Sequence, residues 1–409
     1  MAKSDNKNIC CIDVGTTKIC SIMATPGQGG NLKVLGVGVT QSKGLHKGLV
    51  VNINEAKESI RSSIHKAEQA SALRMESVYV GVTGRHITSL NKKGVVSIAR
   101  GDKLVRPDDL KRVLRTARSF SIPNDRKLLH VIPRGYAIDG QVGVKNPVGM
   151  HGFRLDVETH IITAAVSSVQ NLVKCIRGSN LEIEDLVLEP LASAEAVLRP
   201  DERDAGVVLA DIGGGTTDIA IFKNGSIWHT AILPVAGYQI TRDIAIGLGL
   251  PFDIAEQMKR KYGSVMPSYD GVDDEPANLN MENGYGVSYQ DMNDIIRARV
   301  EEILKLAALE LPSDYAKEVP AGLVLTGGCS NLRGIEALGQ EVLGVPVRRG
   351  VPTGVYGIAD ILTDPAYATS VGLLLWGSKK HPGEEGWQAG GAAETLRRFV
   401  TRMRRVISH

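Results

Sequence analysis

The sequence has few aromatic residues and no long hydrophobic run. Aromatic residues make up 4% of the 409 residues, whereas glycine occurs 45 times. This composition suits an α/β protein with many tight strand–turn–helix junctions better than a β-sandwich. No stretch of about 18 consecutive apolar residues occurs, so we expect no membrane-spanning helix. The opening residues, MAKSDNKN, lack the apolar core of a secretory signal.

The sequence has no CxxC motif, and its net charge is small. None of the five cysteines lies in a CxxC pair, which is typical of buried, reduced thiols in a cytosolic protein. They are Cys10, Cys11, Cys20, Cys175 and Cys329. The net charge is +3, yet residues 394–409 contain five Arg and one Glu. The rest of the chain therefore carries about −1, the difference between +3 and +4, which argues against nucleic-acid binding.

A strand–turn–strand pattern occurs twice in the chain. The first copy has strands at 9–14, 18–24 and 32–40, and the second has strands at 207–212, 216–222 and 227–233. In both copies an apolar strand with one Asp enters a glycine turn followed by Thr-Thr, as IDVGTTK and as DIGGGTTD. Internal duplication of a β-β-β-α unit is the simplest explanation.

The remaining pattern predicts further helices and strands around these hairpins. Helical spacing or capping signals predict helices at 54–70, 107–119, 169–178, 189–198, 300–311, 331–343 and 367–376. Apolar runs predict strands at 77–84, 94–99, 128–138, 159–166, 184–188 and 322–326. Residues 264–288 are polar and rich in turn formers, which indicates an exposed excursion.

The two glycine turns have the chemistry of a phosphate site. Small residues leave backbone N–H groups open to phosphate oxygens, and Thr hydroxyls add donors. The strand residues Asp13 and Asp211 suit a Mg²⁺ ion held through water, and Lys18 has the reach for a β- or γ-phosphate. A third element, LVLTGGCSNL at 323–332, leads an apolar strand into a Gly-Gly turn and a helix capped by Ser330 or Asn331. It predicts a backbone that runs along an adenosine.

Together these three elements resemble the actin, heat-shock chaperone and sugar-kinase superfamily. Within it the chain is similar to the FtsA family of bacterial cell-division proteins. The matching segments are GLHKGLVVNIN at 44–54, DLVLEPLASA at 185–194, PVAGYQITRDIA at 234–245, AEQMKRKYG at 255–263 and LTGGCSNLRGI at 325–335. The resemblance implies an α/β, actin-like (ribonuclease H-like) duplicated ATPase fold with an inserted α+β subdomain.

The resemblance also implies domain boundaries. They are 1–84, 159–200 and 367–378 for subdomain 1A; 85–158 for the inserted subdomain 1C; 201–236 and 311–366 for subdomain 2A; and 237–310 for subdomain 2B. A linker at 379–393 and a helix at 394–409 follow.

Site roles follow from the resemblance residue by residue. ATP and Mg²⁺ would be the ligands, with Asp13 and Asp211 orienting Mg²⁺-bound water and Glu189 polarising the attacking water. Phosphate contacts would come from Gly15, Thr16, Thr17, Lys18, Gly213, Gly214, Gly215, Thr216, Thr217 and the helix N-terminus at Gly237. Nucleoside contacts would come from Glu256, Lys259, Gly327, Gly328 and Asn331, although Glu256–Lys259 also fits a surface helix pair. Ala236 stands where relatives often have Gly.

The C-terminal segment has the pattern of a basic amphipathic helix. Its apolar residues fall on one arc of about 120°, and its Arg residues take the rest. The predicted membrane residues are Leu396, Arg397, Arg398, Phe399, Val400, Arg402, Met403, Arg404, Arg405, Val406 and Ile407. Such a helix lies in an anionic membrane interface rather than spanning it. The alternative is a helix docked on the protein's own body.

The sequence therefore predicts an ATP-binding adaptor with at most slow ATPase activity. By resemblance it would polymerise and tether the FtsZ ring to the cytoplasmic face of the cell membrane at the division site. The FtsZ C-terminal peptide would bind at 238–310, and later divisome membrane proteins would bind the inserted subdomain. Two alternatives stay open, the FtsA-like component of a type IV pilus machine and a small-molecule kinase.

Overall fold

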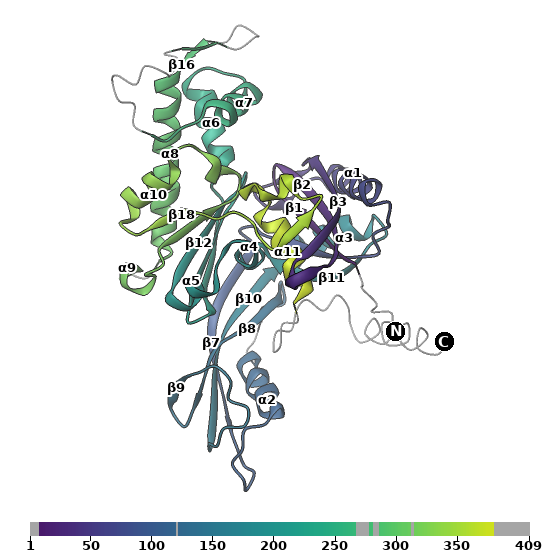
Figure 1. The fold of residues 1–409 in the computed structure, drawn as a ribbon, viewed down its shortest axis with the longest axis vertical. Coiled ribbons are helices and arrows are strands. Elements are labelled where there is room, and N and C mark those ends of the chain that lie inside the picture. The colour runs from purple at the N-terminus through teal and green to yellow at the C-terminus, as the bar shows by residue number, and fades with distance from the viewer. Residues whose placement is uncertain (1–7, 120–121, 267–277, 281–285, 312–314, 380–409) are drawn as a thin grey trace.

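The computed structural model describes residues 8–119, 122–266, 278–280, 286–311 and 315–379. Two lobes lie side by side, and a third, elongated unit extends from their junction (Figure 1). We call the unit around the six-stranded sheet the first lobe, that around the five-stranded sheet the second lobe, and the elongated four-stranded unit the insert. Among the described residues, no helix has the length and apolar content needed to cross a membrane.

The two lobes share one sheet topology. In the first, β1 (Ile9–Val14), β2 (Lys18–Pro26) and β3 (Leu32–Gln41) form an antiparallel meander, and β6 (Ser77–Val82) runs parallel to β1. In the second, β12 (Val207–Ile212), β13 (Thr217–Lys223) and β14 (Ser226–Leu233) do the same, with β17 (Leu323–Thr326) parallel to β12. The pairing matches the duplication expected from the two hairpin motifs.

Further strands at the edges complete both sheets. β11 (Glu182–Leu188) and β19 (Val355–Gly357) flank the first sheet, and β18 (Val347–Arg349) flanks the second. The first lobe's helices are α1 (Ile53–Ser71), α3 (Val166–Arg177), α4 (Glu189–Val197) and α11 (Ala368–Ser378). Those of the second are α5 (Pro200–Ala205), α6 (Gly237–Gly247), α7 (Phe252–Tyr262), α8 (Tyr289–Leu309), α9 (Tyr315–Glu318) and α10 (Ile335–Leu343).

Helices α4 and α11 pack closely against each other beside the first sheet. A side chain at Gly372 of α11 would press against the Ala192 carbonyl of α4, 3.0 Å from the Ser193 nitrogen. Only glycine allows this approach. The contact matters for function because Ser193, Thr369 and Ser370 face buried carboxylates from both hairpins.

The insert is a separate sheet with its own small core. Its strands are β7 (Ile87–Ser97), β8 (Arg126–Ile138), β9 (Gln141–Val144) and β10 (Arg154–Ala165), in the order β7-β10-β8-β9. Strand β10 pairs with β7 and β8 along its length. The boundary predicted at 158/159 therefore falls inside a continuous strand of the insert.

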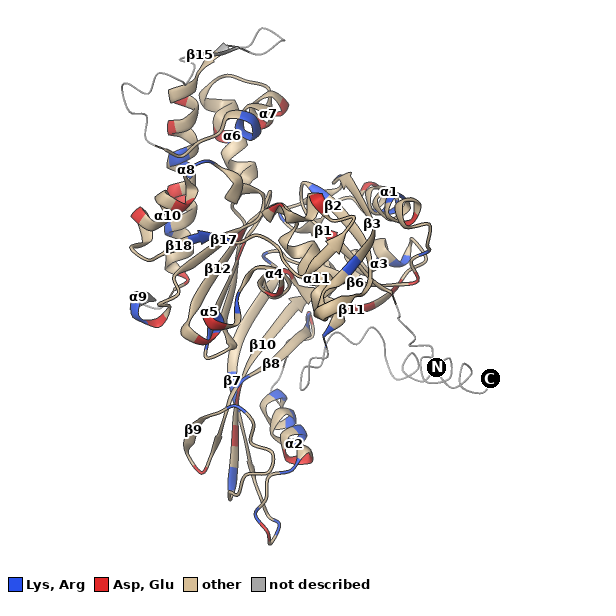
Figure 2. Ribbon diagram, viewed as in Figure 1, with Lys and Arg blue, Asp and Glu red and all other residues tan. Residues whose placement is uncertain are grey.

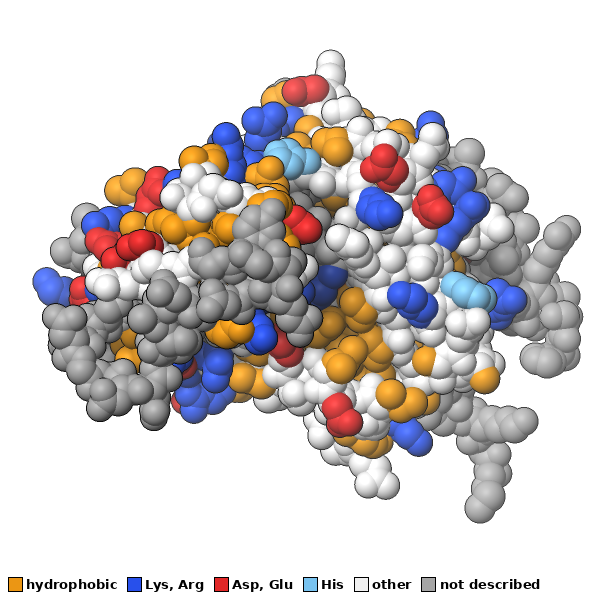
Figure 3. Space-filling view, turned by 90° about the horizontal axis from the view of Figure 1, so that it is seen from above, with side chains coloured by type: hydrophobic (Ala, Val, Ile, Leu, Met, Phe, Trp, Pro, Cys, Tyr) orange, Lys and Arg blue, Asp and Glu red, His pale blue; other side chains and the backbone are white. Residues whose placement is uncertain are grey.

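Helix α2 (Pro107–Arg118) covers one face of the insert and begins at the proline that the sequence indicated. Asp108 and Asp109 lie in its first turn and Arg115 and Arg118 in its last, which complements the helix dipole. Figure 2 shows this change from red to blue along α2, and both charge signs across the rest of the described chain. Seen from above, hydrophobic side chains gather near the centre of the surface, among residues of both charges (Figure 3).

Two predicted helix starts are wrong. Helix α8 begins at Tyr289, not at 300, because Ser288 caps it by accepting the Asp291 N–H at 3.2 Å. Residues 328–331 form a 3₁₀ turn, and α10 starts only at Ile335. The Ser330 hydroxyl donates to the Gly327 carbonyl at 2.7 Å, and Gly334 takes a left-handed conformation that interrupts a continuous helix.

Two short hairpins complete the described chain. The first, β4 (Leu45–His46) with β5 (Leu49–Val50), lies between β3 and α1. The second, β15 (Asn278–Asn280) with β16 (Gly286–Ser288), precedes α8. The predicted linker and basic helix at 379–409 lie outside the described residues from residue 380 onward.

Candidate nucleotide site

The two glycine turns, residues 15–17 and 213–216, meet across the junction of the lobes. We call them the first and second phosphate turns, after the role predicted from the sequence. A side chain on Gly214 would come within 2.9 Å of the Thr17 hydroxyl oxygen and closer still to the Thr17 methyl group. A side chain on Gly215 would come within 2.8 Å of the Thr16 Cβ. Real Cβ atoms essentially never approach a neighbour closer than 3.0 Å. These glycines are therefore required by the contact between lobes, in addition to any ligand.

A cavity of about 970 Å³ opens where these turns meet. Both lobes line it, and nearly every residue predicted for the site contributes. The predicted residues that line it are Asp13, Gly15, Thr16, Thr17, Lys18, Glu189, Asp211, Gly213, Gly214, Gly215, Thr216, Gly237, Glu256, Lys259, Gly327, Gly328 and Asn331. Thr217 does not: it is fully buried, and its hydroxyl donates to the Val235 carbonyl at 2.7 Å.

Two buried aspartates mark corresponding positions in the two lobes. Asp13 accepts a 2.6 Å hydrogen bond from the Ser370 hydroxyl. Asp211 accepts one of 2.6 Å from Ser193 and one of 3.1 Å from Thr369. Burial raises the pKa of both carboxyls, although these hydrogen bonds and the nearby Lys18 charge work in the opposite direction. The helices α4 and α11 thus hold both aspartates in place.

Two further carboxyls share this cavity, and one of them was missed from the sequence. Asp218 accepts a 2.6 Å hydrogen bond from Thr83 of the other lobe. Burial, and then the charges of Asp211 and Asp13, raise the pKa of Asp218 to about 8. Burial first, and then the three aspartates, hold the pKa of Glu189 well above its usual range. Asp218 could have been found, since it ends the DIGGGTTD motif and lies opposite Asp211 in the β12–β13 register.

The carboxyl cluster fits a hydrated divalent cation. The charges of Asp13 and Asp211 raise the pKa of Asp218, and those of all three aspartates raise the pKa of Glu189, so a positive charge among them would relieve this repulsion. Within the described part of the chain, no three acidic, His or Cys side chains lie close enough to enclose a bare metal ion. Mg²⁺ usually keeps several waters and binds through one or two carboxylates, which suits Asp13 and Asp211 as outer ligands.

Lys18 is held at the edge of the cavity by the opposite segment. Its ammonium donates to the Ala366 carbonyl and lies 4.8 Å from the centre of the Tyr367 ring. A cation over an aromatic face gains roughly 0.5–1 kcal/mol at exposed sites. Lys18 therefore lies beside the predicted phosphate position and also ties β2 to residues 366–367.

Lys259 and Glu256 form an ion pair inside the cavity wall. Their charged atoms lie 2.6 Å apart, and Lys259 also donates to Thr241 at 2.7 Å and to the Gly237 carbonyl at 3.1 Å. The Lys259 side chain is 9% exposed and that of Glu256 36% exposed. This pair joins α7 to α6, so the surface-pair alternative does not describe Lys259.

Gly237 is already engaged within the protein. Its N–H donates to the Gly213 carbonyl at 3.1 Å, and the Tyr238 N–H donates to the Gly214 carbonyl at 2.7 Å. The start of α6 is thus attached to the second phosphate turn. The predicted contact from Gly237 to a phosphate would require its bond to Gly213 to open.

The third glycine element completes the cavity from the second lobe. Gly327 has φ 82°, and a side chain there would lie 2.6 Å from the Ile212 carbonyl oxygen and closer to Asp211. Asn331 lies at the rim, where its amide donates to Asp364 at 2.8 Å. The Thr-Gly-Gly (TGG) turn at 326–328 therefore lies close to the end of β12, and both of its glycines line the cavity.

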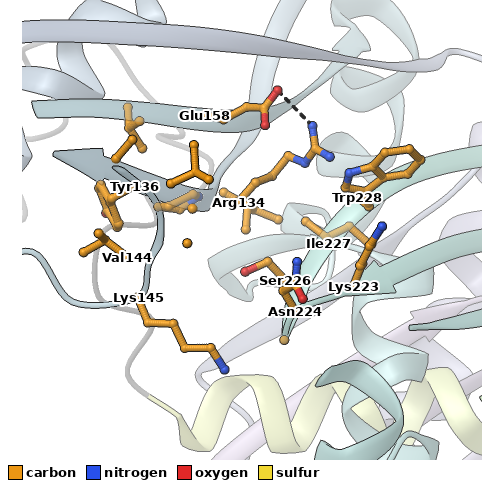
Figure 4. Close-up of a pocket in the computed structure, with 18 of the residues that line it drawn as sticks. Arg134, Tyr136, Val144, Lys145, Glu158, Lys223, Asn224, Ser226, Ile227 and Trp228 are labelled. Atoms are coloured by element: carbon orange, nitrogen blue, oxygen red, sulfur yellow. Dashed lines mark ion pairs between the residues drawn. The ribbon is translucent and has the colours of Figure 1, made fainter. Parts of the chain in front are cut away.

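A second cavity, of about 1130 Å³, lies between the insert and the β13–β14 hairpin (Figure 4). There Arg134 pairs with Glu158 at 3.3 Å, and its guanidinium lies 5.1 Å from the Trp228 ring centre. Lys145 and Lys223 also line this cavity, and each pairs with a carboxylate of the second lobe. No residue predicted for the nucleotide site lines this cavity.

Comparisons with protein families match the chain in two places. Residues 208–372 match the family model described as cell division protein FtsA, and residues 84–163 match that of the SHS2 domain inserted in FtsA. Cell division protein FtsA of Pseudomonas aeruginosa is 42% identical over 377 residues, which cover 91% of this chain and 90% of the relative. The FtsA protein of Neisseria meningitidis serogroup B is 37% identical, and the match covers 97% of this chain and 99% of the relative. That of Escherichia coli K12 is 34% identical, and the match covers 92% of each chain.

Solved structures confirm the predicted actin-like fold at low sequence identity. The PilM–PilN type IV pilus biogenesis complex contains a chain with TM-score 0.66 and 18% identity, with 92% of this chain and all of that chain covered. MreB5 of Spiroplasma citri bound to ADP has TM-score 0.54 and 13% identity, with 89% and 94% covered. These likenesses establish the fold, whereas the sequence relatives establish the family. The chain belongs to the FtsA family of cell-division proteins.

Proposed function

We propose that the chain binds Mg²⁺-ATP between its lobes and uses the nucleotide to set their relative orientation. The observation that carries this proposal is the single cavity formed by both phosphate turns, the TGG turn and four buried carboxyls. Backbone N–H groups and Thr hydroxyls of both lobes would hold the phosphates, and Lys18 would move from Ala366 to reach them. When bound, Mg²⁺ would neutralise phosphate charge, with Asp13 and Asp211 holding its water ligands.

Slow hydrolysis is consistent with the state of the acidic groups. A general base must be deprotonated to accept a proton from water. The raised pKa values of Glu189 and Asp218 keep protons on these carboxyls. In the metal-free chain Glu189 can therefore orient water but is a weak proton acceptor. We expect ATP to bind readily and to be hydrolysed slowly.

Family membership and the tail sequence extend the proposal to an adaptor. The actin-like body would polymerise, and the basic residues of 394–409 would hold the polymer on anionic lipid at the cytoplasmic face of the membrane. One amphipathic helix binds weakly and reversibly, so many tails along a polymer would give firm attachment. The FtsZ C-terminal peptide, bound at residues 238–310, would connect the polymer to the FtsZ ring. Later divisome membrane proteins would bind the insert.

Electron microscopy on lipid monolayers tests this function. The full chain with Mg²⁺-ATP should form filaments on anionic lipid and recruit FtsZ that carries its C-terminal peptide. The chain truncated after residue 393 should form no filaments on the lipid. FtsZ that lacks its C-terminal peptide should not bind to the filaments and should stay in solution. Filaments that form equally without nucleotide, or equal lipid binding by the truncated chain, would contradict the proposal.

A further inference from the structure

Three aromatic rings lie in a row along the wall of the nucleotide cavity. His46 and Tyr238 meet edge to face with ring centres 5.9 Å apart, and Tyr238 meets Phe252 at 5.1 Å. All three line the cavity, and Tyr238 and Phe252 are 37% and 42% exposed. The nucleotide contacts predicted from the sequence include none of these rings. Rings exposed to this extent do not belong to the buried core, and these three contact one another at a cavity wall.

Of the two ring contacts, only the one between His46 and Tyr238 joins the two lobes. His46 belongs to β4 of the first lobe, whereas Tyr238 and Phe252 begin α6 and α7 of the second. Opening of the lobes would therefore break the His46–Tyr238 contact and leave the Tyr238–Phe252 contact intact. Phe252 supports the Tyr238 ring from its own lobe.

Each side of this contact is attached to one phosphate turn. The β4–β5 hairpin is tied to the first turn by the Gly48 N–H, which donates to the Thr16 hydroxyl at 3.1 Å. Tyr238 is tied to the second turn by its N–H, which donates to the Gly214 carbonyl at 2.7 Å. The distance between the two rings therefore follows the distance between the two turns.

We propose that His46 and Tyr238 form an aromatic clasp that closes the phosphate end of the cavity and slows nucleotide release, with Phe252 as its positioning residue. The inference rests on the proposed nucleotide binding and adds the elements that control exchange. A ligand that draws the two turns together also brings the rings together. Release then requires the ring contact to break, as well as the phosphate contacts.

The test measures release of a fluorescent ATP analogue by stopped-flow in the full chain with Mg²⁺. Aromatic pairs of this kind contribute about 0.5–1.5 kcal/mol, which corresponds to about two- to tenfold in rate. His46→Ala and Tyr238→Ala should each accelerate release by this factor, and the double variant should release no faster than either. Tyr238→Phe, which keeps the ring, should restore slow release.

An exposed aromatic residue far from the cavity provides a control for the ring substitutions. Phe153→Ala removes an aromatic side chain of 66% exposure from the insert and should leave release unchanged. Thermal unfolding without nucleotide should give the same midpoint for His46→Ala, Tyr238→Phe and the unmodified chain, which separates the clasp from a structural role. Tyr238→Ala also loses its packing on Phe252, so its midpoint is not used for this comparison. Unchanged release in His46→Ala, or additive effects in the double variant, would overturn the clasp while nucleotide binding stands. Absence of binding by the unmodified chain would instead overturn the proposed function, and the clasp with it.

Discussion

Gly214→Ala offers a direct probe of the contact between the two phosphate turns. The added methyl group would lie 2.9 Å from the Thr17 hydroxyl oxygen and still closer to the Thr17 methyl group. Gly214 does not have a positive φ, so alanine suits its own backbone. The clash lies entirely between lobes, and separation of the lobes relieves it. The substitution should therefore act on the closed arrangement rather than on the fold of either lobe.

The magnitude follows from the cost of overpacking. Extra methyl groups in tightly packed positions typically cost about 1–3 kcal/mol, which corresponds to about 5- to 150-fold in affinity. Mg²⁺-ATP affinity should fall by this factor in titration calorimetry, with little change in the thermal midpoint of the nucleotide-free protein. Thr17→Ser removes the methyl group nearest the added atom, so the double variant should recover part of the affinity.

A matched substitution controls for a general effect of glycine replacement. Gly101 has no positive φ, and a side chain there meets nothing within 4 Å, so Gly101→Ala should leave affinity unchanged. Equal affinity in Gly214→Ala and the unmodified chain would show that the turns need not touch for nucleotide to bind. Loss of affinity that Thr17→Ser fails to improve would place the clash elsewhere.

Three further predictions concern the buried polar groups. The unfolded chain loses the Asp218 proton above the ordinary pKa of 3.8, whereas the folded chain keeps it up to about pH 8. The stability of the folded chain should therefore fall as pH rises through this interval. The thermal midpoint of Asp218→Asn should accordingly vary less with pH over this interval than that of the unmodified chain; identical slopes would contradict the raised pKa. Asp211→Ala should weaken Mg²⁺-ATP binding by about 10- to 100-fold, since it removes a charged acceptor, and equal affinity by calorimetry would exclude the metal role. His160 bonds to Asn91 at 2.7 Å and to Thr230 at 2.9 Å, so His160→Leu should lower the free energy of unfolding by about 1–3 kcal/mol; an unchanged urea midpoint would refute this role.

The sequence predicted those parts of the fold that short-range pattern determines. Both hairpins form within a few residues of their turns, and their glycine turns with strand aspartates all line the cavity between the lobes. Helix α2 begins at Pro107 because proline suits the first helical position. Strand β19 escaped prediction because three residues at 355–357 are stabilised by pairing with β3, far away in the sequence.

The start of α8 and the position of Asp218 were available from the sequence but were not predicted. Met292, Ile296 and Val300 repeat at intervals of four and are buried on one face of α8, so the helical period begins before residue 300. Asp218 lies in the motif that identified the second phosphate turn. By contrast, the hydrogen bond from Thr83 to Asp218 joins residues 135 positions apart, and only the packing of the lobes brings them together.

Two residues predicted to contact phosphate instead form hydrogen bonds within the protein. Thr217 stands beside Thr216 in the sequence, but strand alternation turns its side chain away from the cavity, toward Val235. Gly237 lies at the expected helix start, yet its N–H is taken by the Gly213 carbonyl. Residue type identified the cavity, whereas side-chain direction and hydrogen-bond partners required the structure.

Equilibrium titration of the full chain with ATP, in the presence and absence of Mg²⁺, measures directly whether the cavity between the lobes binds Mg²⁺-ATP. Because one cavity joins both lobes, we expect saturable binding of one ATP per chain that weakens at least about tenfold when Mg²⁺ is removed. Absence of saturable binding, or equal affinity with and without the metal, would contradict an interlobe Mg²⁺-ATP site.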